Sequence, residues 1–236
     1  MAWSALLLPA LATWGLESVY SGKVVSFLEK PPPLDAREGI GVQALSTEGN
    51  PTYMGFFQSV RIEAPLAKTL GTVLDFESYP ETLVDVVSTS FKKLENGRYE
   101  VLLEQRIPLP FVPNERNVMI YEVVRSSDDS ALIRYQLKSS KYLRFYDGAI
   151  LLSARGKSQT EYLAVDFWDA DWGLAKAFGT DRLWRSNLEG LLQADLAVKL
   201  KAENPAWPNA KVKDESRKLA ASLPIKDWVK RRSAAR

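Results

Sequence analysis

Carboxylic acids, tyrosines, lysines and arginines are the side chains available for acid–base chemistry in this chain, because it contains no histidine and no cysteine. Thiol nucleophiles, imidazole bases and metal sites built on those residues are therefore excluded. The central acids are Asp75, Glu77, Glu104, Asp166, Asp169 and Asp171. No pair has a spacing that forces two carboxyl groups together, and no nucleophile elbow or phosphate-binding loop is present. The sequence thus identifies no catalytic residue and no cofactor.

A metal site is not predicted either. Asp169 and Asp171 are two residues apart between Trp168 and Trp172. Two carboxylates fall far short of the ligand set of a calcium loop. We predict a turn or an apolar cover at this position.

Aromatic and basic residues on successive strand-like segments are the next candidates. Tyr121, Tyr135 and Tyr146 would orient a ligand oxygen if their hydroxyl groups lay on an apolar wall, and would otherwise pack at the surface. Arg106 interrupts an apolar alternation. If it points inward it needs a carboxylate such as Glu104 or one from a ligand, and if it points outward it is an ordinary surface residue.

The elements that position these residues follow from periodicity. Alternation with period two predicts seven strands, at 53–63, 86–94, 99–107, 116–125, 131–139, 144–154 and 160–168. Asn96-Gly97 between two such runs indicates a hairpin. Two short helices are expected after the first strand, beginning at Pro65 and Pro80.

A long amphipathic helix is predicted from Asp181 to Glu203, with Thr180 as its N-cap. Its apolar stripe contains Leu183, Trp184, Leu188, Leu191, Leu192, Leu196 and Leu200. Asn187 and Asp195 lie near this stripe. They are either its polar flanks or polar groups that face a hollow.

The order of these elements resembles the START-like (SRPBCC) superfamily, which includes polyketide cyclases, coenzyme Q-binding proteins and lipid-transfer domains. The resemblance rests on Val60-Arg-Ile-Glu-Ala-Pro65, on Asp75-Phe-Glu-Ser-Tyr-Pro80, on Gly148 at a strand start and on Thr160-Glu161-Tyr162. It implies an α+β helix-grip fold, in which a curved antiparallel sheet of about seven strands wraps round the long C-terminal helix.

The same resemblance implies a cavity between sheet and helix that binds or transfers a hydrophobic small molecule such as a lipid, sterol or quinone. A cyclase or hydratase acting in that cavity is the alternative. It also implies that the loop after the last strand covers the cavity mouth. The expected ligand-binding residues are Arg106, Tyr121, Tyr135, Tyr146, Trp168, Trp172, Trp184, Asn187, Leu188 and Leu191.

Composition divides the chain into an N-terminal extension (1–52), the START-like domain (53–204) and a basic tail (205–236). Residues 211–236 carry nine basic and three acidic side chains, a net charge of +6, which leaves −4 of the total +2 for the remainder. We therefore do not expect the domain to bind nucleic acid. The tail is either a solvated or surface-packed segment or a contact for an anionic membrane.

The first residues are compatible with two cellular locations of the protein. The apolar stretch at 3–14 contains Ala10-Leu11-Ala12, a small-x-small pattern typical of signal-peptide cleavage, but it has no basic residue before it. Export to the periplasm or outside the cell is expected, and a cytoplasmic, membrane-peripheral protein is the alternative. The sequence does not fix the oligomeric state.

Overall fold

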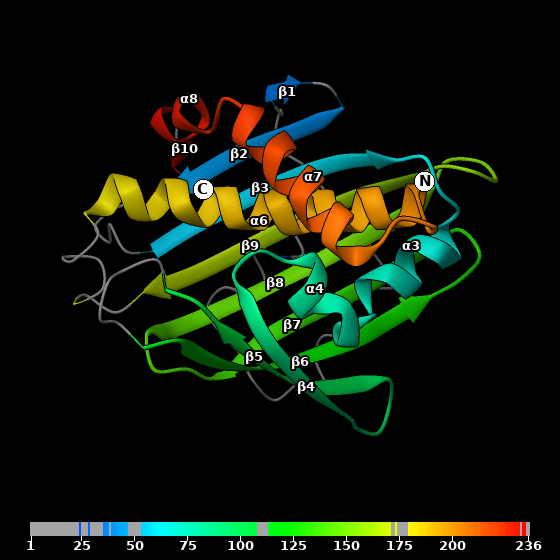
Figure 1. Ribbon diagram of the computed structural model, residues 1–236, viewed down its shortest axis with the longest axis horizontal. Helices are drawn as coiled ribbons and strands as arrows, with labels where there is room; N and C mark the ends of the chain where they lie inside the picture. Colours follow the sequence, from blue (N-terminus) through cyan, green and yellow to red (C-terminus); the bar gives the residue numbers. More distant parts are fainter. Residues whose placement is uncertain are drawn as a thin grey trace.

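A single large sheet, in which all strand pairs but one are antiparallel, forms the framework of the protein (Figure 1). The computed structural model describes residues 24, 28, 35–37, 39–46, 53–107, 113–170, 173, 179–231 and 233–234. Nine strands follow the order β1-β2-β3-β9-β8-β7-β6-β5-β4, and a tenth, β10, pairs with β2. Their bounds are Asp35–Arg37 (β1), Ile40–Ser46 (β2), Tyr53–Ile62 (β3), Val86–Lys93 (β4), Arg98–Gln105 (β5), Glu115–Ser126 (β6), Ser130–Ser139 (β7), Leu143–Ala154 (β8), Thr160–Ala170 (β9) and Ser233–Ala234 (β10).

The seven predicted strands are confirmed as β3 to β9, each within a few residues of its expected ends. The β4–β5 hairpin turns at Asn96 and Gly97, which have φ angles of 58° and 70°. Two consecutive positive φ angles are what a tight hairpin turn requires, and asparagine and glycine adopt them most readily. The sheet is larger than expected, because β1, β2 and β10 extend it beyond β3.

Three short helical segments follow β3, where two were predicted. They are α3 (Leu66–Val73), the 3-10 turn η1 (Phe76–Ser78) and α4 (Tyr79–Thr82). Pro65 precedes the first residue of α3, and its carbonyl oxygen accepts hydrogen bonds from the backbone N–H groups of Lys68 and Thr69. Together these segments lead the chain from one side of the sheet to the edge strand β4.

The predicted long helix is confirmed as α6 (Thr180–Glu203), which lies along the inner face of the sheet in Figure 1. Its N-cap is Gly179 with φ 75°, so the prediction that Thr180 caps the helix was wrong by one residue. The C-terminal end of the helix is held against β3, because the Glu203 carboxylate accepts a hydrogen bond from the Glu63 N–H at 2.7 Å and the Lys199 ammonium donates to the Arg61 carbonyl at 2.7 Å. These bonds fix the distance between helix and sheet at one end.

The residues outside 53–204 also contribute to the packed structure. β2 pairs with β3 along seven residues. The basic tail forms α7 (Asn209–Ser222) and α8 (Ile225–Lys230), and α7 packs on α6 and α4. Leu223, Ile225, Trp228 and Val229 are buried in the main core. The tail is therefore surface-packed, with its apolar side chains directed into the domain.

A second, smaller core lies on the outer face of the sheet. It contains Val24, Leu28 and outward-facing strand residues such as Phe57 and Phe167. Beside it, Arg134 on β7 and Asp147 on β8 form a buried ion pair with an N–O distance of 2.9 Å. Such a pair has to be complete, because a single buried charge without its partner is strongly destabilising.

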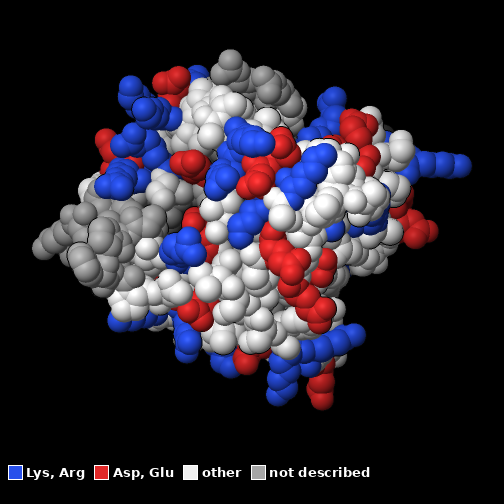
Figure 2. Space-filling view, viewed as in Figure 1, with Lys and Arg blue, Asp and Glu red and all other residues white. Residues whose placement is uncertain are grey.

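Charges of both signs are interspersed over the face that carries α6 and α7 (Figure 2). On α7, Arg217 pairs with Asp214 and Lys218 pairs with Glu215. Among the described residues, no helix is long and apolar enough to cross a membrane.

Candidate functional site

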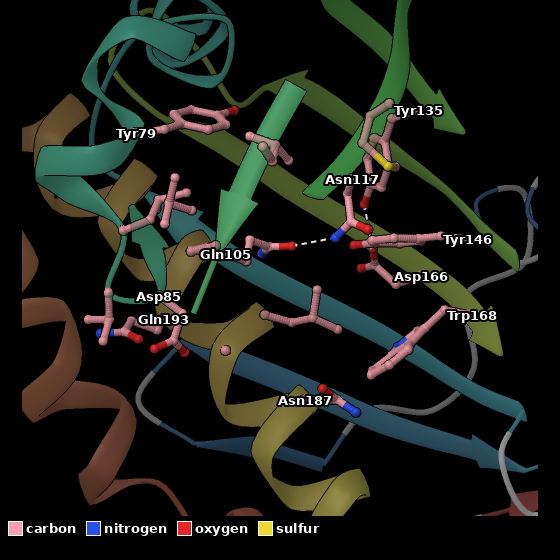
Figure 3. A pocket seen from close by; sticks show the side chains of 18 of the residues that line it. Tyr79, Asp85, Gln105, Asn117, Tyr135, Tyr146, Asp166, Trp168, Asn187 and Gln193 are labelled. Atoms are coloured by element: carbon pink, nitrogen blue, oxygen red, sulfur yellow. Dashed lines mark hydrogen bonds between the residues drawn. The ribbon is translucent and has the colours of Figure 1, made fainter. Parts of the chain in front are cut away.

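A cavity of about 300 Å³ lies between the inner face of the sheet and α6 (Figure 3). Its walls are the inward-facing residues of β5 to β9, the segment after α4, and one side of α6. This volume is at the lower end of the range for small-molecule sites in proteins. Most of the wall is aliphatic or aromatic, and a few polar groups converge within it.

One row of residues crosses the sheet and supplies much of this wall. Register places Tyr99, Tyr121 and Tyr135 opposite one another on β5, β6 and β7, and continues through Gly148 on β8 to Asp166 on β9. The rings of Tyr121 and Tyr135 have centroids 5.3 Å apart. At Gly148 the row has no side chain, and the ring of Tyr135 occupies that space.

Gly148 is required because a Cβ atom there would lie 2.3 Å from Cε2 of Tyr135 and 2.7 Å from its hydroxyl oxygen. The Tyr135 ring can therefore pass over β8 and reach the next strand. Its hydroxyl group donates a hydrogen bond to Oδ1 of Asp166 at 2.6 Å. The hydroxyl group of Tyr146 donates to the same oxygen at 2.9 Å. Figure 3 shows both tyrosines beside Asp166.

Asp166 is almost fully buried, and burial raises the pKa of its carboxyl group to about 6. The hydrogen bonds from Tyr135 and Tyr146 act in the opposite direction, because they stabilise the ionised form. The nearby Gln58 amide also lowers the pKa of Asp166. Neither polar atom of the Gln58 side chain, however, makes a hydrogen bond of normal geometry within the described structure. Burial and the charge of Asp166 raise the pKa values of both tyrosines. The cluster therefore holds a carboxyl group that changes protonation near neutral pH.

A second buried acid, Asp195, projects from α6. Its Oδ1 accepts a hydrogen bond from the hydroxyl group of Tyr162 on β9 at 2.7 Å. Burial holds the pKa of Asp195 well above its usual value. The Tyr162 hydrogen bond lowers this pKa, and the nearby charge of Asp166 raises it further. This bond links the sheet directly to the middle of the helix.

Four amide side chains, two from the sheet and two from α6, add further polar groups to the wall. Asn117 on β6 donates from Nδ2 to Oε1 of Gln105 on β5 at 2.7 Å, as the dashed line in Figure 3 shows. Gln193 comes from α6. Asn187, also on α6, lies near Trp168 in the same view. Hydrogen-bonding groups thus face the cavity from both the sheet and the helix.

The structure brings most of the predicted ligand-binding residues to this cavity. Its lining includes Arg106, Tyr121, Tyr135, Tyr146, Trp168, Asn187 and Leu191. Trp184 and Leu188 do not line it. They face β3 and the core, where the Trp184 ring lies edge-on to Phe56 at 5.3 Å. Trp172, together with the predicted cover over the cavity mouth, lies outside the described residues. The ligand-binding role of each residue stays a prediction.

Arg106 lies at the rim of the cavity with an exposed side chain, just after the end of β5. Glu104, the partner considered for it, instead contacts Arg116 at 3.5 Å and Asn114 at 2.9 Å. The reason is alternation, because Glu104 points away from the cavity on β5 while Leu103 and Gln105 point into it.

The expected ligand-binding residues did not include Asp166, Tyr162 or Asp195, which the structure places in the cavity wall. For the first two a signal was present, since Tyr162, Ala164, Asp166 and Trp168 share one face of a strand with period two. For Asp195 the sequence left two alternatives, a polar flank of the helical stripe or a group that faces a hollow, and the structure places it in the cavity wall with 6% exposure. Its position follows from the rotation of α6 over the sheet, which the stripe alone does not fix.

No protein-family model and no curated protein sequence matches this chain. Solved structures do match it. A STAR-related lipid transfer protein from Xanthomonas axonopodis shares 17% identity, with 77% of this chain and 96% of that chain covered and a TM-score of 0.51. The human StarD13 lipid transfer and protein localization domain shares 15% identity, with 80% and 98% covered and a TM-score of 0.53.

A protein from a biosynthetic pathway also has a similar structure. The di-domain ARO/CYC StfQ from the steffimycin biosynthetic pathway shares 12% identity, with 66% of this chain and 53% of that chain covered and a TM-score of 0.50. At these identities the likeness concerns the fold. The chain has the START-like helix-grip fold, as its sequence predicted.

The close approach at Gly148 gives the first prediction. We expect Gly148→Ala to displace Tyr135 from Asp166 and to reduce the free energy of unfolding by about 1–3 kcal/mol, because an extra methyl group overfills a packed site. Gly71→Ala is the matched control, since nothing lies within 4 Å of its Cβ position in α3. Chemical denaturation of both variants measures the effect. Equal stability of the two variants would contradict the role assigned to Gly148.

The second prediction concerns pH. The pKa of Asp166 is about 6 when folded against 3.8 ordinarily, so the folded protein retains a proton that the unfolded chain releases. Stability contributed by this group is therefore full below about pH 4 and falls as pH rises to about 6, by roughly 3 kcal/mol in total.

Asp166→Asn removes this titration. Relative to the variant, we expect the free energy of unfolding of the wild type to fall over that pH range, as measured by urea denaturation at a series of pH values. Parallel curves for the two proteins would show that Asp166 does not have a raised pKa.

Proposed function

We propose that this protein binds a hydrophobic small molecule with at least one polar group in the cavity between the sheet and α6. The observation that carries the proposal is the composition of the wall, in which aromatic and aliphatic side chains surround a small set of buried hydrogen-bonding groups. That combination is typical of ligand sites, where apolar area supplies affinity and a few polar groups fix orientation.

The buried polar groups argue against a dry core as the purpose of this space. Filling the gap with apolar side chains would avoid the cost of burying Asp166 and Asp195. Both carboxyl groups instead lie in the wall, each held by tyrosine hydroxyl groups. Lipids, sterols and quinones all combine a large apolar body with an oxygen-bearing group. The lipid transfer proteins of similar fold support a lipid-like ligand.

Transfer between membranes is a further part of the proposal. The apolar residues of α8 pack inward, so a membrane contact made by the tail would depend on basic side chains such as Lys226 and Lys230. Each basic group near an anionic surface contributes about 1 kcal/mol. Binding of the tail to such a surface would then weaken as salt increases.

Filling the cavity tests the binding function. Ala194 lies on α6 in the cavity wall, and we expect Ala194→Phe to remove the ligand while the protein stays folded. Protein purified from cells is extracted with organic solvent and analysed by mass spectrometry, and the extract is returned to measure the rise in Tm. The control is Glu189→Phe, which places the same side chain at an exposed position of α6. Wild-type protein with no extractable molecule and no rise in Tm would refute binding.

A second candidate function is an enzyme of the cyclase or hydratase type. One observation favours it, namely a carboxyl group with a pKa near 6 that contacts two tyrosine hydroxyl groups in the cavity wall. A group with such a pKa can donate or accept a proton near neutral pH.

The molecules extracted from wild-type and Asp166→Asn protein separate the two functions. For a binding protein we expect the same molecule from both, because the cavity keeps its shape. An enzyme would instead release its product from the wild type and retain substrate in the variant, so two different molecules would overturn the binding proposal in favour of catalysis.

A further inference from the structure

Charges of one sign predominate in the cavity wall. Four carboxyl groups and one guanidinium group line the cavity within the described structure, and they belong to Asp85, Glu115, Asp166, Asp195 and Arg106. Arg106 and Asp85 have exposed side chains at the rim, where the Arg106 N–H also donates to the Asp85 carbonyl at 2.7 Å. Inside the cavity the carboxyl groups are those of Glu115, Asp166 and Asp195, and no basic side chain of the described residues lies beside them.

Three polar atoms in this wall have no hydrogen-bond partner within the described residues. They are Oδ2 of Asp195, Oδ1 of Asn117 and Nε2 of Gln193. Their side chains are 6%, 2% and 6% exposed, so solvent at the protein surface does not satisfy them. Buried polar groups of this kind are rare in native structures, and a missing ligand is one explanation for them. Oδ1 of Asn117 accepts hydrogen bonds and Nε2 of Gln193 donates them, whereas Oδ2 of Asp195 accepts when the carboxyl group is ionised and can donate when it is protonated.

We propose that the cavity selects its ligand by charge, accepting molecules whose buried polar group is a hydroxyl or an amine and excluding molecules whose buried polar group is an anion. This inference depends on the proposed binding function and narrows the ligand class. A hydroxyl or amine can donate to Oδ1 of Asn117, and a hydroxyl can form a hydrogen bond with Oδ2 of Asp195 in either protonation state. A hydroxyl can also accept from Nε2 of Gln193.

An anionic group meets the opposite conditions. It has no hydrogen to donate to Oδ1 of Asn117, and it lies beside Asp166, which is ionised above its pKa of about 6, with no basic side chain of the described residues inside the cavity. Like charges in contact are strongly unfavourable where water is excluded, and specificity often depends on such repulsion. Arg106 does not remove the repulsion, because its exposed side chain lies at the rim beside Asp85.

Three probes with the same apolar chain test the proposal, namely decanol, decylamine and decanoate. Binding to the wild-type protein is measured by calorimetry at about pH 8, where the amine is cationic and the carboxylate anionic. We expect decanol and decylamine to bind and decanoate to bind at least about tenfold more weakly. Decylamine is essential, because an apolar cavity without acids would reject both charged probes.

Two variants identify the source of the selectivity. Asp166→Asn removes the buried acid that is ionised at pH 8 with little change in shape, and we expect the difference between decylamine and decanoate to narrow. Asp169→Asn is the matched control. Asp169 is on β9 but pairs with Arg144 at 3.0 Å outside the cavity wall, so the difference should persist in this variant.

The wild-type series alone decides the inference, even if Asp166→Asn fails to fold. Decanoate binding as tightly as decylamine would overturn charge selection and leave the binding function intact. Equal rejection of decylamine and decanoate, with decanol bound, would also overturn it, because desolvation alone would then explain the pattern. If none of the three probes binds and no molecule is extracted from the purified protein, the binding function itself fails.

Discussion

The burial of two carboxyl groups between the sheet and the long helix is the constraint on which this structure depends. Asp166 on β9 and Asp195 on α6 would each be costly in an apolar interior. Tyrosine hydroxyl groups offset that cost by donating hydrogen bonds at 2.6 to 2.9 Å. Because Tyr162 and Asp195 come from different layers, their bond sets how closely helix and sheet approach, and the space left beside it is the cavity.

The position of these acids depends in turn on strand register. Tyr135 reaches Asp166 because Gly148 stands between them in the same row and leaves room for the ring. A shift of one residue would turn the whole row to the other face. The outer face has its own core and the buried pair of Arg134 and Asp147, so the register is specified from both sides of the sheet.

The segments before and after the START-like domain extend the sheet and cover the long helix. β2 lies beside β3, and α7 packs on α6 and α4. The Lys213 ammonium donates to the Pro80 carbonyl at 2.9 Å, and Asn209 donates to Glu81 at 2.7 Å. Since α4 leads directly into the residues at the cavity rim, the tail braces one wall of the cavity as well as covering the helix.

The sequence by itself determined the strands β3 to β9, the helix α6 and the START-like fold, because alternation and helical periodicity reflect which side of each element is buried. It also indicated Tyr121, Tyr135 and Tyr146, which lie on the cavity-facing side of the successive strands β6, β7 and β8. Only the tertiary structure decided that Trp184 and Leu188 face the core while Asp195 faces the cavity. The rotation of a helix over a sheet, and the row that joins Tyr135 to Asp166, depend on contacts between residues far apart in the chain.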